Sequence, residues 1–138
     1  MNTIIAALCI TMGAKTVALD TTHFTLAWTH SVAKTRWEED YRLGQDGRLV
    51  LTEARIAGTG PGMEPPPHAQ LRAGVWHYVP DLPPLPELRL TISPYTADYD
   101  LCWNGRCQKL TRILSAPLDP AVATITACAA ATHPNTAP

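Results

Sequence analysis

The sequence predicts an all-β fold, a single antiparallel β-sandwich or small barrel of about eight or nine strands. Three observations support this prediction. Short segments in which apolar and polar residues alternate recur along the chain, with turn residues between them. Thirteen prolines are spread through the 138 residues, and prolines at this density argue against long helices. The pairs Asp46-Gly47 and Asn104-Gly105 supply the positive φ angles that tight hairpin turns require.

Two strands are predicted near the start of the sequence, over residues 4–10 and 16–19, with a turn at Gly13 between them. No Lys or Arg precedes the first apolar run, and Thr11 and Gly13 interrupt it, so the stretch lacks the pattern of a secretory signal peptide. No segment of the sequence is long and apolar enough to span a bilayer. We therefore expect a cytoplasmic protein, with the periplasm as the alternative location.

The stretch over residues 24–43 reads as two strands joined by a tight hairpin connection. Each strand has one apolar face, and each apolar face carries one ionisable residue, His30 in the first strand and Glu39 in the second. An even-length connection centred between residues 34 and 35 predicts that His30 lies opposite Glu39, with Cβ atoms roughly 5 Å apart. Such a pair is either a buried polar contact within the core or part of a functional site.

The same alternation predicts further strands over residues 48–57, 75–79 and 88–92, and a hairpin within residues 98–110. The strand over residues 48–57 has an ambiguous inward face. Two apolar residues on one face compete with three on the other: Leu49 and Leu51 against Val50, Ala54 and Ile56.

Beyond residue 114 the sequence changes character. It becomes rich in Ala, Thr and Pro and has no periodicity. Such a segment offers little apolar surface for a core. We therefore divide the chain into one β domain over residues 1–114 and a disordered tail over residues 115–138.

The four cysteines have different prospects. Cys102 and Cys107 flank the predicted hairpin turn and should face each other as a non-hydrogen-bonded pair, with Cα atoms about 4.5 Å apart. They are a disulfide candidate, or a pair of reduced thiols if the protein is cytosolic. Cys9 and Cys128 have no obvious partner. The C-x4-C spacing, without a second Cys/His pair, does not match a zinc site, and we expect no metal and no cofactor.

Other chemistry finds little support in the sequence. His30 and Ser31 cannot act together as base and nucleophile, because adjacent residues of a regular strand point to opposite faces. The glycine-rich segment over residues 58–67 does not match a dinucleotide fingerprint. Its backbone N–H groups could form a small anion-binding nest, and the alternative is an ordinary crossover between sheets. The net charge of −1 gives no electrostatic reason to expect nucleic acid as a partner.

Three segments, HSVAKTRWEEDYRL, GTGPGMEPPP and LCWNGRCQKL, resemble the bacterial family called domain of unknown function 1850, or DUF1850. The resemblance covers about residues 8–110, and the family carries no established activity. Its members are often encoded beside tripartite (TRAP-type) transporters of the TAXI class, which implies an accessory role in solute uptake. The family's characteristic residues match the following positions: His30, Ser31, Lys34, Glu39, Gly60, Gly62 and Met63.

The sequence departs from the family pattern at two positions. Ala33 stands where an acidic residue is usual, and Pro61 stands where a small residue is usual. The first departure removes an acidic group from the hairpin tip. The second stiffens the glycine-rich loop.

Two functional hypotheses follow. The first is a non-catalytic accessory or binding module that recognises a small anion or a transporter component. Its site is expected where residues 30–34 approach the loop over residues 58–63, with Lys34 supplying charge and the loop N–H groups fixing orientation. The alternative is a small enzyme that uses His30 and Glu39 as an acid–base pair. The first hypothesis is favoured because the sequence offers hydrogen-bond donors but no activated nucleophile.

Overall fold

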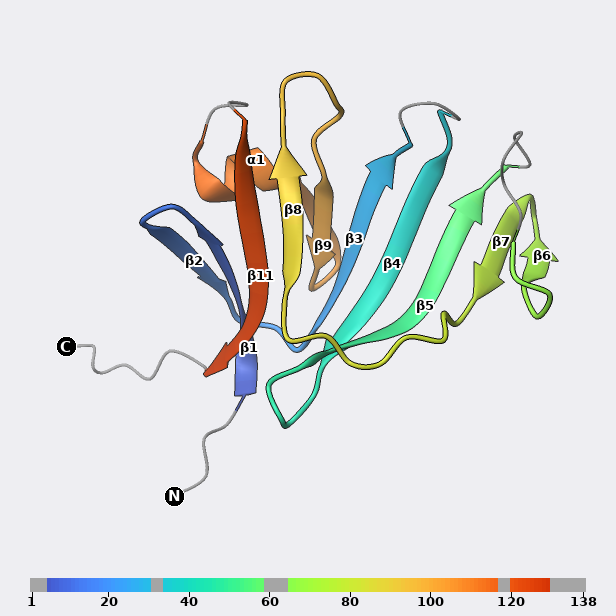
Figure 1. The fold of residues 1–138 in the computed structure, drawn as a ribbon, viewed down its shortest axis with the longest axis horizontal. Coiled ribbons are helices and arrows are strands. Elements are labelled where there is room, and N and C mark those ends of the chain that lie inside the picture. The colour runs from blue at the N-terminus through green and yellow to red at the C-terminus, as the bar shows by residue number, and fades with distance from the viewer. Residues whose placement is uncertain (1–4, 31–33, 59–64, 117–119, 130–138) are drawn as a thin grey trace.

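The computed structural model describes residues 5–30, 34–58, 65–116 and 120–129. Its strands form two antiparallel sheets with almost no helix, which confirms the predicted all-β, sandwich-like fold (Figure 1). Eleven strands are present among the described residues, and so the predicted number of eight or nine was too low. The two strands that the sequence did not predict are β6 (Gln70–Arg72) and β11 (Ala121–Ala129).

The smaller sheet has the strand order β2-β1-β11-β8. Its other three strands are β1 (Ile5–Met12), β2 (Lys15–Leu19) and β8 (Leu88–Ile92). The predicted hairpin at Gly13 is confirmed, because β1 pairs with β2 and Gly13 adopts a φ of 59°. This left-handed conformation costs glycine little, and it lets the chain turn tightly between the two strands.

Strand β11 contradicts the prediction of a disordered tail over residues 115–138. It lies between β1 and β8, pairs with both, and buries Ala123 and Ile125 completely. The prediction was wrong for this segment because its small Ala and Thr side chains give only a weak hydrophobic alternation. Residues 117–119 and 130–138 of the predicted tail lie outside the described residues.

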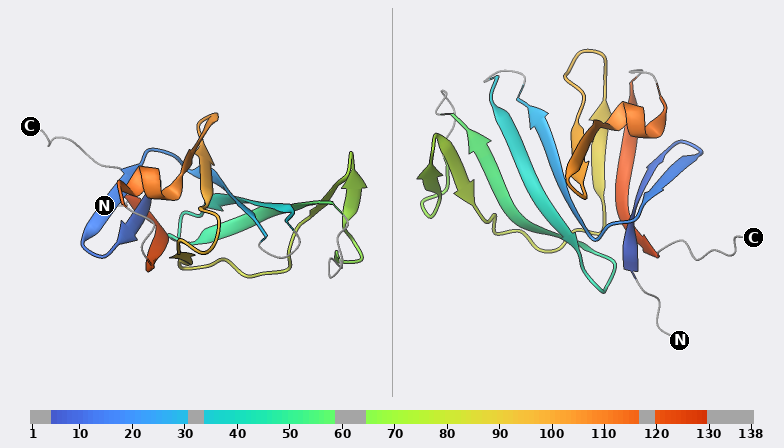
Figure 2. Two further views of the ribbon diagram at one scale, coloured as in Figure 1. Left: turned by 90° about the horizontal axis from the view of Figure 1, so that it is seen from above. Right: turned by 180° about the vertical axis from the view of Figure 1, so that it is seen from behind.

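The larger sheet has the strand order β10-β9-β3-β4-β5-β7-β6. The remaining strands are β3 (His23–Thr29), β4 (Arg36–Leu43), β5 (Leu49–Ala57), β7 (Val75–Tyr78), β9 (Asp100–Trp103) and β10 (Arg106–Lys109). The predicted Asn104-Gly105 turn is confirmed, since both residues have the positive φ of a type I′ hairpin. Figures 1 and 2 show that this sheet extends well past the smaller one, so that β5, β7 and β6 form a wing at one side of the molecule.

A β-bulge resolves the ambiguous facing of β5. Asp40 pairs with Glu53 and Tyr41 pairs with Leu51, which leaves Thr52 without a partner. Because a single extra residue turns the following side chains over, apolar residues of both registers can face inward. The inward set is Leu49, Leu51, Ala54 and Ile56.

The main core lies between the two sheets, and the short helix α1 (Leu110–Leu114) packs against it. Its fully buried large side chains come from both sheets and from the helix: Leu8, Ile10, Leu26, Leu49, Leu101, Leu110, Leu114 and Ile125. Each such side chain contributes about 1.5–3 kcal/mol through burial. The wing residues Ile56, Trp76 and Tyr78 are not part of this cluster. The inner face of the wing therefore lies outside the core that the two sheets enclose.

Both disulfides join neighbouring antiparallel strands. Cys102 and Cys107 are bridged, with Cα atoms 4.0 Å apart, which agrees with their predicted cross-strand pairing. Cys9 and Cys128 are also bridged, between β1 and β11, with Cα atoms 5.9 Å apart. The sequence did not predict the second bridge, because the two cysteines are separated by 119 residues and one lies in the strand taken for a tail.

Candidate functional site

The pairing of β3 with β4 differs from the predicted register. Leu26 lies opposite Glu39, and Trp28 lies opposite Trp37. The prediction that His30 faces Glu39 was therefore wrong. The shift is an even number of residues, and for this reason the side chains keep their predicted faces although their partners change.

The connection lies two residues earlier in the sequence than predicted, and this position causes the shift. Thr29 pairs with Arg36, so the connection runs from residue 30 to residue 35. Two backbone hydrogen bonds close it: the His30 N–H donates to the Thr35 carbonyl at 2.8 Å, and the Lys34 N–H donates to the His30 carbonyl at 2.9 Å. Lys34 has a φ of 57°, a left-handed conformation that is uncommon for residues other than glycine.

Aromatic rings line the inner face of the larger sheet around this end of the hairpin. His30 stacks on Trp37 with ring centroids 5.5 Å apart, and Trp37 stacks on Trp28 at 6.1 Å. Tyr99 meets Trp28 edge-on at 6.1 Å. The same cross-strand row continues onto the wing, where Ile56 and then Trp76 follow Trp37. These rings form a continuous, partly exposed apolar surface.

Glu39 lies in the next cross-strand row. Its neighbours across the sheet are Leu26 on β3 and Ala54 on β5, and Tyr78 on β7 follows Ala54. The Tyr41 hydroxyl donates a hydrogen bond to Glu39 Oε1 at 2.7 Å. Glu39 is thus a carboxylate on an otherwise apolar and aromatic face.

The electrostatics of this carboxylate follow from its surroundings. Burial raises the pKa of Glu39, and the hydrogen bond from Tyr41 opposes this rise only in part. Burial, followed by the charge of Glu39, raises the pKa of both Tyr78 and Tyr99. Both phenols therefore lie within electrostatic reach of the carboxylate, and they stay protonated at neutral pH.

A pocket of about 400 Å³ lies between the β8 edge of the smaller sheet and the inner face of the larger one. Its aromatic walls come from the larger sheet and the chain that enters it, and its hydroxyl groups come mainly from β8 and the segment after it. We call this the inter-sheet pocket, lined by Trp28, Thr29, His30, Thr91, Ser93, Thr96, Ala97 and Tyr99. Figure 1 shows why these segments meet: β3 and β8 end, and β9 is approached, at the same end of the molecule.

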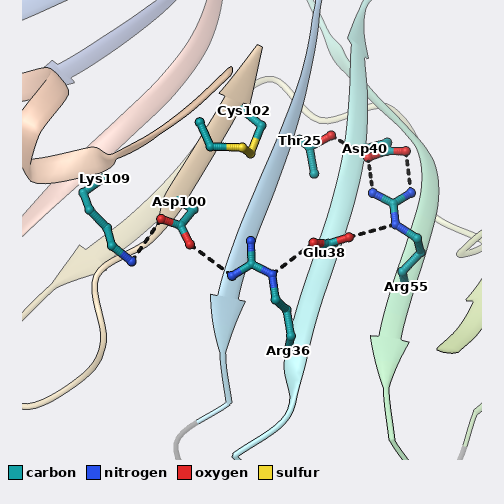
Figure 3. The surroundings of a disulfide bond; sticks show 9 residues. Thr25, Arg36, Glu38, Asp40, Arg55, Asp100, Cys102 and Lys109 are labelled. Atoms are coloured by element: carbon teal, nitrogen blue, oxygen red, sulfur yellow. Dashed lines mark hydrogen bonds and ion pairs between the residues drawn. A yellow bond between two sulfur atoms is a disulfide. The ribbon is translucent and has the colours of Figure 1, made fainter. Parts of the chain in front are cut away.

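The outer face of the same sheet carries a chain of ion pairs (Figure 3). Asp100 lies between Lys109 and Arg36, and Glu38 lies between Arg36 and Arg55, each at 3.0 Å. The Arg55 guanidinium also binds Asp40 through two nitrogens, at 2.6 and 2.7 Å. Because these charges neutralise one another, this face offers no unbalanced charge for a ligand along the chain of pairs that the structure describes.

The pKa values of the outer carboxylates contrast with that of Glu39. Hydrogen bonds from Arg55 hold the pKa of Asp40 below its usual range. Burial acts to raise the pKa of Glu38, but hydrogen bonds from Arg55 and Arg36 outweigh it and lower that pKa. The alternation of the sequence predicts which residues face outward. It does not predict these partners, which depend on the observed register.

The structure brings together only some of the predicted site residues. His30 lines the inter-sheet pocket, whereas Lys34 is exposed on the connection and Glu39 lies farther along β4. Since His30 does not face Glu39, the acid–base enzyme hypothesis loses its geometric basis. The other predicted binding residues, Ser31, Gly60, Gly62 and Met63, lie outside the described residues.

One contact supports the expected meeting of the hairpin end with the glycine-rich segment. A Cβ atom placed on Gly58 would lie 3.3 Å from Thr35 Cγ2, so the start of that segment touches the end of the connection. Gly58 has a φ of 87°, and its N–H donates to the Gly74 carbonyl at 3.0 Å. This position therefore requires glycine for both space and conformation.

Sequence reasoning missed several residues of the pocket. Tyr99 precedes β9, Thr91 lies near the end of β8, a strand of the other sheet, and Ser93 directly follows that strand. Their approach to His30 depends on how the two sheets pack. No alternation or spacing within a single segment carries that information.

The described part of the chain contains neither a metal-binding cluster nor a membrane-spanning helix. No group of three or more His, Cys, Asp and Glu side chains there is arranged to hold a metal ion. No helix among those residues has the length and apolar character needed to cross a membrane.

A family model described as a domain of unknown function (DUF1850) matches residues 24–110. The match covers nearly all of the larger sheet and β8, and it leaves out β1, β2 and β11. Comparisons with curated proteins and with solved structures found no match.

Proposed function

The chain belongs to the DUF1850 family, and from this membership and the geometry of the inter-sheet pocket we propose that it is a non-catalytic binding module for a small polar solute. The pocket is the observation that carries the proposal. Its volume of about 400 Å³ falls within the range of small-molecule sites. Apolar walls with a few convergent polar groups are also typical of such sites.

The groups around the pocket suggest how a solute would be held. The rings of Trp28 and Tyr99 provide flat apolar contact. The hydroxyl groups of Thr91 and Ser93 and the imidazole of His30 can donate hydrogen bonds to an acceptor on the solute. A carboxylate is the first acceptor to test, since it agrees with the expectation of a small anionic ligand.

The resemblance to proteins encoded beside TAXI-class transporters supports an accessory role in solute uptake. Under this proposal the solute that the pocket binds is one that the uptake system handles. A transporter subunit that docks over the pocket is the alternative partner, and it would be recognised through the same aromatic surface.

We also propose that the protein works in an oxidising compartment, the periplasm in a bacterium. All four cysteines of the sequence form disulfides. Disulfides persist outside the cytosol, where thiols are not kept reduced, and this supports the periplasmic alternative over the expected cytoplasmic location. Alkylation of free thiols in intact cells before lysis tests the proposal. Labelling of the native protein would contradict it.

Calorimetric titration against a panel of monocarboxylates, dicarboxylates and amino acids tests the binding function. A ligand of the pocket should lose at least about tenfold in affinity with His30→Ala or Ser93→Ala, because each change removes a donor. His23→Ala is the matched control, since His23 lies exposed at the other end of the same strand. Lys34→Ala tests whether the lysine on the exposed connection also contributes to the affinity.

The outcomes separate the alternatives. Binding that is equally unaffected by His30→Ala, Ser93→Ala and Lys34→Ala would move the site away from this end of the molecule. No binding of any solute, combined with capture of a purified transporter subunit that Trp28→Ala abolishes, would make the protein an interaction module.

A further inference from the structure

Glu39 differs from its neighbours on β4 in how its charge is balanced. Glu38 and Asp40 face outward, and Arg55 binds both of them. Glu39 faces inward, and its hydrogen-bond partner is the neutral hydroxyl of Tyr41. Among the residues that the structure describes, no cationic side chain forms an ion pair with Glu39. This carboxylate has lost part of its hydration, and a cation that binds beside it would offset that loss.

The surroundings of Glu39 suit a cation. Tyr41 and Trp37 flank it along β4, two residues away on the same face. Across the sheet the small, buried Ala54 separates it from Tyr78, so a second tyrosine lies in the same cross-strand row as the carboxylate. Aromatic faces attract cations through their quadrupole, and ammonium groups are bound in proteins by such rings combined with a carboxylate.

Glu39 is also connected to the inter-sheet pocket. Tyr99 lines that pocket and lies within electrostatic reach of Glu39. Trp28 lines it too and stacks on Trp37, the neighbour of Glu39 on the same face of β4. Glu39 is only half-buried, so solvent reaches it. The aromatic wall therefore leads from the pocket to the carboxylate.

We propose that the aromatic surface around Glu39 binds a cationic group, a primary or quaternary ammonium, on the solute that the protein recognises. The inference rests on the proposed binding function and adds the charge class of the ligand. Glu39 supplies the negative charge, and the rings of Tyr78 and Tyr99, with the exposed part of Trp37, supply aromatic surface that contacts the alkyl groups of the ammonium. A ligand that also carries a carboxylate would place that group toward His30 and the hydroxyl groups of the pocket.

Pairs of isosteric probes test this inference directly. Glycine betaine and 3,3-dimethylbutanoate have the same shape and the same carboxylate, and differ in a positive nitrogen against a neutral carbon. Choline and 3,3-dimethylbutanol form a second such pair, and butylammonium with butan-1-ol forms a third for a primary amine. Titration calorimetry should show at least one cationic probe binding roughly tenfold or more tightly than its neutral partner.

Two variants on neighbouring residues give the matched control. Glu39→Gln should remove the preference for the cationic probe and leave the affinity of its neutral partner within about twofold, because it keeps the shape and the Tyr41 bond. Glu38→Gln changes the adjacent carboxylate on the opposite face of the same strand and should leave the preference intact. Melting curves for both variants confirm that the comparison is made on folded protein.

Each result decides the matter. Equal affinity for both members of every pair overturns the cationic ligand class but leaves the binding function standing, provided that His30→Ala still weakens binding. Absence of binding by all three cationic probes at millimolar concentration also overturns it. A preference that Glu38→Gln removes as fully as Glu39→Gln would show that the net charge of the molecule, and not the inner face, attracts the cation.

Discussion

Figure 3 shows the Arg55 guanidinium bound to Glu38 and Asp40 on the outer face of the larger sheet. It donates hydrogen bonds to three carboxylates, those of Glu38, Asp40 and Glu53, at distances between 2.6 and 3.0 Å. Its side chain is only 20% exposed, so water screens these bonds less than it screens an isolated surface pair. Charge-assisted, two-pronged bonds of this kind are among the stronger polar contacts in proteins.

We expect Arg55→Ala to lower the free energy of unfolding by about 1–2 kcal/mol at pH 7, because three carboxylates lose their shared cation. Arg55 lowers the pKa of each carboxylate in the folded state. Their contribution is therefore present above the unfolded pKa of about 4 and is lost as the pH falls through the folded values. The difference between variant and wild type should shrink at pH 3.

Urea unfolding at the two pH values measures this effect. Arg48→Ala is the control, since Arg48 is 58% exposed and its contact with Asp46 spans 4.0 Å. That variant should change stability by less than about 0.5 kcal/mol. Equal effects of the two substitutions would contradict the assigned role of Arg55.

The raised pKa of Glu39 predicts that its contribution to folding stability has the opposite pH dependence. Its folded pKa is raised, so the stability linked to its protonated form is fully present below the unfolded pKa of about 4.3 and is lost as the pH rises through the folded value. Glu39→Gln cannot ionise, and it should gain stability relative to wild type between pH 4 and pH 7. Glu38→Gln should lose stability relative to wild type as the pH rises from acid through the unfolded value of about 4.3, because the pKa of Glu38 is lowered. Parallel trends in the two variants would show that the facing is misassigned.

At the scale of single elements, the bulge at Thr52 decides what β5 presents to the inner face. Without it, one half of the strand would turn its apolar side chains outward. The half before the bulge contributes Leu49 to the main core, and the half after it contributes Ile56 to the wing. The site of the candidate ligand depends on this change of facing, because Ala54 lies beside Glu39 only in the bulged register.

Deletion of Thr52 should lower the free energy of unfolding by about 3 kcal/mol or more, since regular pairing must expose at least one large apolar side chain and leave its cavity unfilled. Thr52→Ala keeps the chain length and should cost less than about 1 kcal/mol. Equilibrium unfolding of both variants measures the difference. A deletion that is as mild as the substitution would mean that the bulge can move along β5.

The sequence predicted elements well where the signal lies within one segment, and poorly where it lies between segments. Gly13 and Asn104-Gly105 determine their turns through local conformation, and both hairpins were predicted correctly. The register of β3 against β4 was not, because the position of the connection at residues 30–35 depends on hydrogen bonds formed within it. The same holds for the pocket, where Thr91 reaches His30 only through sheet packing.

At the scale of the whole molecule, two disulfides cross-link the chain, and the loops that they close differ greatly in length. One closes a separation of 119 residues and the other a separation of five. In the chain-entropy account, the longer loop restricts the unfolded chain more and contributes about 5 kcal/mol, against about 2 kcal/mol for the shorter loop. The long bridge joins two adjacent strands of the smaller sheet and restrains β11, which lies at its centre.

We therefore expect the double variant Cys9→Ser/Cys128→Ser to lose about twice the stability that Cys102→Ser/Cys107→Ser loses. Replacing both cysteines of a pair avoids leaving a free thiol that could form a new bridge. Thermal unfolding under non-oxidising conditions, with each variant compared to fully oxidised wild type, gives the two values. A larger loss for the short bridge would mean that it stabilises the fold locally and not through the unfolded chain.

The central place of β11 has a consequence for how the chain is made. During synthesis, β1 and β8 leave the ribosome well before β11, which must come between them. Until then each of them lacks the neighbour that satisfies its backbone, and Cys9 lacks its native partner. Cys102 and Cys107 lie in one hairpin and need no other segment to come together. The smaller sheet is therefore completed only once β11 has emerged, and its long-range disulfide can close only after the hairpin that carries the short one is already present.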